Sequence, residues 1–265
     1  LLLVAVYLEW LSVENFVYSI ALVFILRMLA MSLYASQLYF PKLKFSFPKN
    51  RSFILKYSGL ILIAGSVAMV LLDLDKVMIE RFLPIEMVAV YGIAVYISSV
   101  IAVPSRAMHQ ITYPMTATLL NNRDKKGLLE LYEKSSLNLL IISGLIFLLI
   151  ITNVRELYEL IPDEYQISFS IVILISCVKL YDNLLGNNNS ILFNSDYYRI
   201  VLENGLFLAL LFYLFNLIFF PEFGLFGAAL ATVLAFFFFI QVKRLMVYLK
   251  FNISPLTRQN LLVFG

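Results

Sequence analysis

The stretch Leu-Asn-Leu-Leu-Ile-Ile-Ser-Gly-Leu-Ile-Phe-Leu-Leu-Ile-Ile-Thr, from Leu137 to Thr152, carries no charged residue and decides the fold class. The hydrocarbon core of a bilayer is about 30 Å thick and a helix rises about 1.5 Å per residue, so about 20 predominantly apolar residues cross it. With its immediate flanks the stretch approaches this length. The sequence therefore predicts a helix that spans a membrane.

Similar apolar runs recur along the whole chain. They are long and lack the alternation of β-strands, which favours helices over a barrel. We predict an all-α polytopic transmembrane helix bundle with about seven complete spans and two partial ones. The runs are Leu1–Leu8 (incomplete), Phe16–Phe40, Phe53–Leu72, Met87–Leu120, Leu137–Thr152, Ile167–Leu185, Ile200–Phe220, Gly224–Leu249 and a last one from about Leu256.

The composition of the 265 residues agrees with this prediction. Hydrophobic residues make up 62%, charged residues 14%, and the mean hydropathy is +0.89. A soluble domain is about 45–50% apolar and about 25% charged, so the composition excludes a soluble enzyme, a disordered tail and a nucleic-acid binder. With Cys177 as the single cysteine and His109 as the single histidine, we expect no disulfide framework, no metal centre and no cofactor.

The ends of the sequence indicate part of a longer membrane protein. The chain starts at Leu1 without a methionine, and it stops inside a new apolar run at Gly265. No basic segment or cleavage site accompanies the first run, so we do not expect a signal peptide.

Charges alternate in sign between successive loops. Alternate loops hold fourteen of the 20 Lys and Arg residues, and the positive-inside rule places these loops in the cytoplasm. The intervening loops are acidic. We assign to the basic loops Lys42, Lys44, Lys49, Arg51, Lys56, Arg123, Lys125, Lys126, Lys134, Arg199, Lys243, Arg244, Lys250 and Arg258.

The longest connection is the basic segment Pro41–Arg51. Its two prolines, Pro41 and Pro48, are typical of a linker between helical bundles, but an ordinary cytoplasmic loop fits the local sequence equally well.

Three basic residues, Arg27, Arg106 and Lys179, fall inside predicted spans. A charge at the bilayer centre costs about 2.5–3.5 kcal/mol on insertion scales, so such residues usually face a bundle interior or a wet cavity. Arg27 has no acidic residue on its own helix face. Because the guanidinium fork matches phosphate, Arg27 is a candidate for binding an anion.

The run Met87–Leu120 carries a polar stripe with helical spacing. Two interpretations stay open: the stripe lines a cavity, or neighbouring helices satisfy it. His109 is likewise either a proton carrier or a satisfied interior histidine. The stripe comprises Ser98, Ser105, Arg106, His109, Thr112, Tyr113 and Thr116, and Pro104 and Pro114 are expected to kink the helix.

Acidic residues inside or near the spans are few. Lys179 and Asp182 are three residues apart and can form an ion pair on one helix, with either a structural or a functional role. Asp73 and Asp75 end another span beside Lys76. They are either ordinary interfacial acids or carboxylates that bind a coupling cation or proton.

Two segments resemble polysaccharide flippases. The first is Leu-Asp-Lys-Val-Met-Ile-Glu-Arg-Phe-Leu at residues 74–83, followed by Val-Tyr-Gly-Ile-Ala at residues 90–94. The second, Gly224–Thr232, is similar to a late helix of the same family, and its small residues let helices approach closely. The chain thus resembles Wzx-type O-antigen or capsular repeat-unit flippases of the MATE-related MOP exporter superfamily.

This resemblance implies two six-helix lobes that face a central cavity and work by alternating access. Residues 1–40 would then end the first lobe, residues 41–51 would form the basic cytoplasmic hinge, and residues 52–265 would form a C-terminally truncated second lobe. The implied substrate is an undecaprenyl-pyrophosphate-linked oligosaccharide in the bacterial inner membrane, with polysaccharide polymerase and glycosyltransferases as associated proteins.

The intramembrane bases outnumber the acids, which favours an anionic substrate. In this hypothesis Arg27, Arg106 and Lys179 hold the anionic head near Asp182, and His109 and Tyr113 shape the wall. One alternative is a cation-coupled multidrug exporter of the same superfamily. Another is a membrane-embedded acyltransferase or polysaccharide polymerase with His109 as its base, although phosphate-loop and HExxH signatures are missing.

Overall fold

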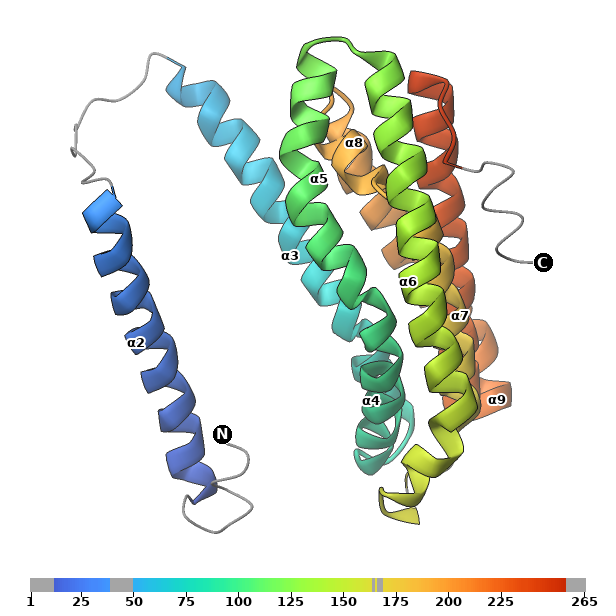
Figure 1. Cartoon of the computed structure of the whole chain (residues 1–265). Helices are drawn as coiled ribbons and strands as arrows, with labels where there is room; N and C mark the ends of the chain where they lie inside the picture. The colour runs from blue at the N-terminus through green and yellow to red at the C-terminus, as the bar shows by residue number, and fades with distance from the viewer. Residues whose placement is uncertain (1–11, 39–49, 164, 166–168, 256–265) are drawn as a thin grey trace. The chain divides into compact units, whose positions relative to one another are not determined.

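The computed structural model describes residues 12–38, 50–163, 165 and 169–255, and this part of the chain contains helices and no strand (Figure 1). The predicted all-α class is confirmed. Four described segments are long and apolar enough to cross a membrane, namely Tyr18–Leu38, Glu86–Asn121, Lys125–Glu159 and Arg199–Phe251. The chain divides into two compact units, Leu1–Leu55 and Lys56–Gly265.

The first unit contains α2 (Val13–Leu38), which corresponds to the predicted span Phe16–Phe40. Apolar side chains are exposed along α2; Leu33, for example, is 67% exposed. Such a surface is suited to lipid or to other membrane helices. The partial run Leu1–Leu8 and most of the predicted hinge, Pro41–Arg51, lie outside the described residues.

The second unit begins within α3 and continues through a kinked helical segment. In that segment a single 3-10 turn, η1, separates α4 from α5, and Pro104 occupies the first turn of α5. The kink expected at Pro104 is therefore present, whereas Pro114 lies inside α5 without ending it. The helices are α3 (Arg51–Phe82), α4 (Glu86–Ser99), η1 (Val100–Ala102), α5 (Val103–Asn121), α6 (Lys125–Glu159) and α7 (Phe169–Leu184).

Two further helices, α8 (Asn188–Phe193) and α9 (Tyr198–Phe251), complete the unit. The 54 residues of α9 form two passes, because Gly224 (φ 54°, ψ −130°) breaks the helix. The passes lie side by side: the Asn204 amide donates to the carbonyl oxygen of Phe239 at 3.4 Å, and the rings of Phe215 and Phe238 are 6.0 Å apart. The two spans predicted here are confirmed, and α8 was not predicted.

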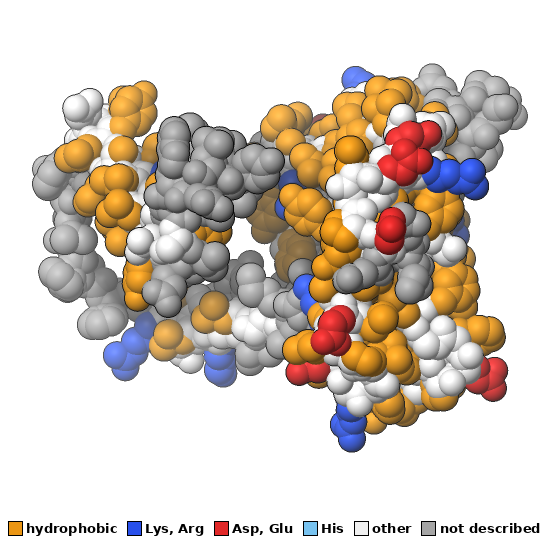
Figure 2. Space-filling view, turned by 90° about the horizontal axis from the view of Figure 1, so that it is seen from below, with side chains coloured by type: hydrophobic (Ala, Val, Ile, Leu, Met, Phe, Trp, Pro, Cys, Tyr) orange, Lys and Arg blue, Asp and Glu red, His pale blue; other side chains and the backbone are white. Residues whose placement is uncertain are grey.

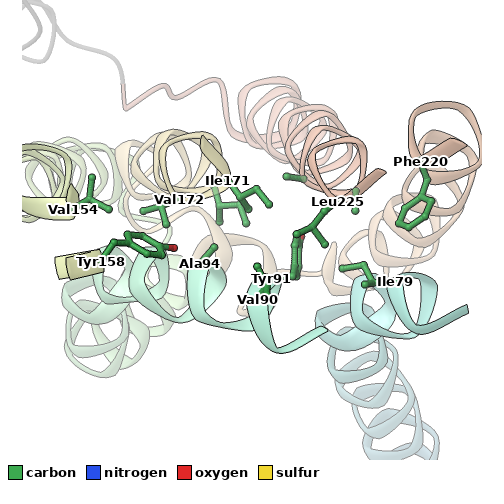
Figure 3. Packing of buried hydrophobic residues seen from close by; sticks show 13 residues of the cluster. Ile79, Val90, Tyr91, Ala94, Val154, Tyr158, Ile171, Val172, Phe220 and Leu225 are labelled. Atoms are coloured by element: carbon green, nitrogen blue, oxygen red, sulfur yellow. The ribbon is translucent and has the colours of Figure 1, made fainter. Parts of the chain in front are cut away.

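Helix α7 lies at the centre of the second unit, packed against α4, α6 and α9. Its first half, with Ile171 and Val172, packs in an apolar cluster with Tyr91 and Ala94 of α4 and Val154 of α6 (Figure 3). Val178, and Leu185 just after the helix, belong to a second, smaller apolar cluster that also contains Ile240 of α9. The polar side chains of the second half of α7, from Ser176 to Asn183, belong to the site described below.

The two ends of the second unit carry opposite charges. Acidic side chains are spread over the end that holds the α3–α4 turn and the C-terminus of α6 (Figure 2). Exposed residues at this end include Glu80, Glu86, Glu156, Glu159 and Glu222, whereas the opposite end exposes Arg123, Lys125, Lys126, Arg199 and Lys250. This separation matches the alternation of loop charges in the sequence.

One assignment in that alternation is wrong. Lys243, which the sequence analysis places in a cytoplasmic loop, lies within α9, and its side chain is only 5% exposed. Arg244 also lies within α9, and Lys125, Lys126 and Lys134 belong to α6.

Candidate functional site

The backbone breaks between α7 and α8 at Gly186, whose φ is +52°. A Cβ at this position would lie 2.6 Å from the backbone nitrogen of Ser136 on α6, so only glycine fits without a shift. The hydroxyl of Ser136 donates to the carbonyl oxygen of Leu184 at 2.5 Å, and the backbone N–H of Asn187 donates to the hydroxyl of Ser135 at 3.2 Å. These bonds satisfy backbone groups that the end of α7 leaves free.

A line of hydrogen bonds joins α7 to α4, η1 and α6. The Ser98 hydroxyl lies 3.3 Å from that of Ser176. The Asn183 amide donates to the carbonyl oxygen of Ile101 at 2.7 Å and to the Ser143 hydroxyl at 2.8 Å. All these side chains are buried, so polar contacts rather than apolar packing fix the helices here.

Asn187 connects the break to the polar stripe on α5. The Thr112 hydroxyl donates to the side-chain oxygen of Asn187 at 2.9 Å, and the side-chain nitrogen of Asn187 donates to the Thr116 hydroxyl. Ser98, Thr112 and Thr116 are therefore satisfied by neighbouring helices, which was one of the two interpretations of the stripe.

The other stripe residues are more accessible. Arg106 is exposed, Tyr113 is 44% exposed, and His109 is half-buried with its Nδ1 3.4 Å from the Ser190 hydroxyl. The carbonyl oxygen of Tyr113 accepts a bond from Asn194 at 3.3 Å. The accessible part of the stripe thus reaches from Arg106 to Tyr113.

The charged centre of the unit is an ion pair between Asp182 of α7 and Lys243 of α9. The Lys243 ammonium lies 3.1 Å from a carboxylate oxygen of Asp182 and 3.3 Å from the side-chain oxygen of Asn189. It also lies 4.4 Å from the centre of the Phe239 ring, which makes a cation–π contact. Lys243 is thus enclosed by groups that attract a cation.

The ion pair expected between Lys179 and Asp182 is replaced by this one. The Lys179 ammonium instead lies 5.1 Å from the centre of the Phe236 ring. It remains within electrostatic range of Asp182, Arg106 and Lys243. Lys243, 61 residues further along the chain, pairs with Asp182 in place of Lys179. This is because α9 brings the Lys243 ammonium closer to the Asp182 carboxylate than α7 brings that of Lys179.

Asp75 is buried near the end of α3, with 6% of its surface exposed. Its carboxylate accepts a bond from the backbone N–H of Lys76 at 2.9 Å and interacts with the hydroxyl of Tyr91. That hydroxyl lies 3.1 Å from Thr232 of α9. Asp75 is therefore buried within the bundle, and the side chain of Asp73 lies outside the described set.

A polar cavity of about 10 Å³ lies beside the ion pair, with His109, Asp182, Asn188 and Lys243 in its lining. This is room for about one water molecule. Both polar atoms of the Asn188 side chain are buried there and make no hydrogen bond within the described protein. An internal amide in this state indicates that a further polar group belongs in the cavity.

The candidate residues thus fall into two sets. His109, Asp182 and Lys243 line one cavity, Lys179 lies within electrostatic range of the ion pair, and Arg106 lies within electrostatic range of Lys179. Arg27 is exposed on α2, in the other unit. Among the described residues, no three of the His, Cys, Asp and Glu side chains are placed to hold a metal ion.

No protein-family model matches the chain, and no curated protein matches it in sequence. Two solved transporter structures match its fold. One is an outward-facing multidrug resistance MATE family transporter of the MOP superfamily, with 17% identity and a TM-score of 0.63 over 77% of this chain and 46% of that chain. The other is a MOP superfamily transporter from Pyrococcus furiosus, with 17% identity and a TM-score of 0.58 over 77% of this chain and 47% of that one.

The fold of the chain is similar to that of these two MOP superfamily transporters. This confirms the polytopic helix bundle and the MATE-like architecture that the sequence predicts. The chain spans less than half the length of either neighbour. Both neighbours are membrane transporters, and their fold agrees with a multi-pass membrane protein.

Proposed function

We propose that the protein moves a lipid-linked oligosaccharide, carried on undecaprenyl pyrophosphate, across the bacterial inner membrane by alternating access. In this proposal the basic end of the second unit faces the cytoplasm, and Arg106 and Lys179 bind the pyrophosphate. His109 and Tyr113 line the path beside them.

The charge balance of the second unit carries this proposal. Lys179 lies within electrostatic range of two other bases, Arg106 and Lys243, and of two acids, Asp182 and Asp75. Since Lys243 is already paired with Asp182, Arg106 and Lys179 are the bases that can meet a ligand. Positive charge offsets the desolvation of a phosphate that enters a low-dielectric site.

The solved structures with a similar fold indicate that the charge of the binding pocket differs between transporters of this fold. The Pyrococcus furiosus transporter is described as having a binding pocket of reverse polarity that suggests a different function. Pocket charge is therefore a useful criterion for separating substrates among proteins of this fold.

The test is flipping of the lipid-linked oligosaccharide by the Arg106→Ala variant, in proteoliposomes and in a strain that lacks the wild-type protein. We expect a loss of about tenfold or more, because a charge-assisted bond to phosphate contributes about 1.5–3 kcal/mol. Arg81→Ala, which removes an exposed arginine at the acidic end, is the matched control. Wild-type flipping by Arg106→Ala at equal protein level would exclude Arg106 from substrate binding.

A second candidate function, cation-coupled drug export, is favoured by the buried carboxylate of Asp75. Asp75 would then bind the coupling cation or proton, which is one of the two interpretations that the sequence leaves open for Asp73 and Asp75. Drug sensitivity of a deletion strain, compared with its surface glycans, separates the two functions. Loss of drug resistance with intact glycans would replace the flippase proposal.

A further inference from the structure

The surroundings of the Lys243 ammonium are those of a bound monovalent cation. A carboxylate oxygen lies at 3.1 Å, an amide oxygen at 3.3 Å, and the centre of an aromatic ring at 4.4 Å. All three groups attract positive charge and require no particular donor geometry from the cation. Because the Lys243 side chain is only 5% exposed, these groups replace most of the water that would otherwise surround it.

Additional oxygen atoms lie next to this ammonium. Asn188, which is among the residues that line the neighbouring cavity, is 2% exposed, and its side-chain oxygen and nitrogen have no partner among the described residues. Ser105 also lines this cavity. If the ammonium were withdrawn, Asp182, Asn189 and Asn188 would leave an oxygen-lined space with a negative charge.

We propose that Lys243 is a tethered cation that permanently occupies a monovalent-cation site formed by Asp182, Asn189 and Phe239. The second unit therefore takes no free Na⁺ or K⁺ at Asp182. Shortening Lys243 converts this position into a site for a small alkali cation. The side chain of Asp182 is 41% exposed, so a cation can reach it, and the cost of leaving its carboxylate unpaired in a membrane bundle favours a cation in the vacated position.

This inference is independent of the transported substrate, because it concerns only the counter-ion of Asp182. In the proposal, the ammonium of Lys243 takes the place of a free cation at Asp182. The flippase proposal can fail without affecting it, and the reverse also holds.

The test is thermal unfolding of the purified, detergent-solubilised protein, followed by circular dichroism, in NaCl, KCl, LiCl or N-methyl-D-glucamine chloride at equal ionic strength. The wild type should unfold at the same temperature in all four salts. Lys243→Ala should be less stable in N-methyl-D-glucamine chloride and should gain about 3 °C in at least one alkali salt. Lys243→Gln, which keeps most of the side-chain volume, is a second variant with the same expected gain.

Two matched controls separate a specific site from a general salt effect. Lys179→Ala removes a neighbouring base that has a ring contact in place of the Asp182 pair, so no alkali salt should stabilise it selectively. The double variant Lys243→Ala/Asp182→Asn lacks the carboxylate, so it should lose the selective gain.

Three results would overturn the proposal. One is selective stabilisation of the wild type by Na⁺, K⁺ or Li⁺. Another is a folded Lys243→Ala or Lys243→Gln variant that responds to no alkali cation. The third is failure of both variants to fold in any of the alkali salts, since the proposal requires that a free cation can replace the ammonium.

Discussion

The two halves of α7 lie in different surroundings. The first half packs Ile171, Val172 and Ile175 among apolar side chains of the neighbouring helices (Figure 3). The second half, from Ser176 to Leu184, exchanges hydrogen bonds with α4, η1 and α6 and ends at the break around Gly186.

This difference shows how a helix is placed inside a membrane bundle. Apolar contacts are only weakly selective there, because lipid tails are as apolar as the helix surface. Hydrogen bonds are more selective, and they also satisfy the backbone where the helix is interrupted. The ion pair and the cavity therefore lie at the polar half, while the apolar half supplies tight packing.

A substitution at the backbone break that follows the polar half of α7 should lower the stability of the protein the most. Gly186→Ala should destabilise the protein by about 2–4 kcal/mol, because it adds a Cβ in a left-handed conformation against the Ser136 backbone. Unfolding in a detergent titration measures the change. The control is Gly144→Ala on α6, where a Cβ meets nothing within 4 Å and should stabilise the helix by about 0.5–1 kcal/mol. Equal effects of the two substitutions would contradict the role of Gly186.

Removing one polar connection should have a smaller effect. Asn183→Ala should lower the free energy of unfolding by about 1–2 kcal/mol, because the bonds to Ile101 and Ser143 are lost in a buried place. Asn153→Ala is the control: that exposed amide bonds to the carbonyl oxygen of Leu149 on its own helix. The same unfolding titration compares the two variants. A larger loss of stability for Asn153→Ala than for Asn183→Ala would contradict the role of Asn183 in placing α7.

The apolar half should be the least sensitive. Val172→Ala should cost about 1 kcal/mol, because it removes two methyl groups from a fully buried position. Val77→Ala, at a position that is 58% exposed, should have almost no effect. A loss at Val172 that exceeds the loss at Asn183 would show that packing, and not hydrogen bonding, places α7.

The sequence predicts the helices well where an apolar run is long. The runs Phe16–Phe40, Met87–Leu120 and Leu137–Thr152 correspond to α2, to α4–α5 and to part of α6. The short α8 escapes prediction because six residues show no helical period. The polar stripe on α5 is visible from its spacing, but only neighbouring helices determine which of its members are satisfied.

The ion pair shows why a candidate site is harder to predict. Lys179 and Asp182 are close in sequence, so local spacing selects them as partners. Lys243 lies near the end of an apolar run, where the positive-inside rule favours a loop assignment. One signal was present: Lys243 lies four residues after Phe239, inside the predicted run Gly224–Leu249. Its distance to Asp182, however, depends on how α9 packs on α7.

The reversal in α9 has a consequence for synthesis of the protein. Gly224 turns the chain so sharply that the two passes share almost no connecting residues, and Gly227 packs closely against the backbone of Phe219. From Leu217 to Gly227 the only charged residue is Glu222, whereas the other end of the hairpin carries Arg199, Arg244 and Lys250. We therefore expect the turn to be the end that crosses the bilayer at low cost during insertion, with both passes entering the membrane together as a preformed pair.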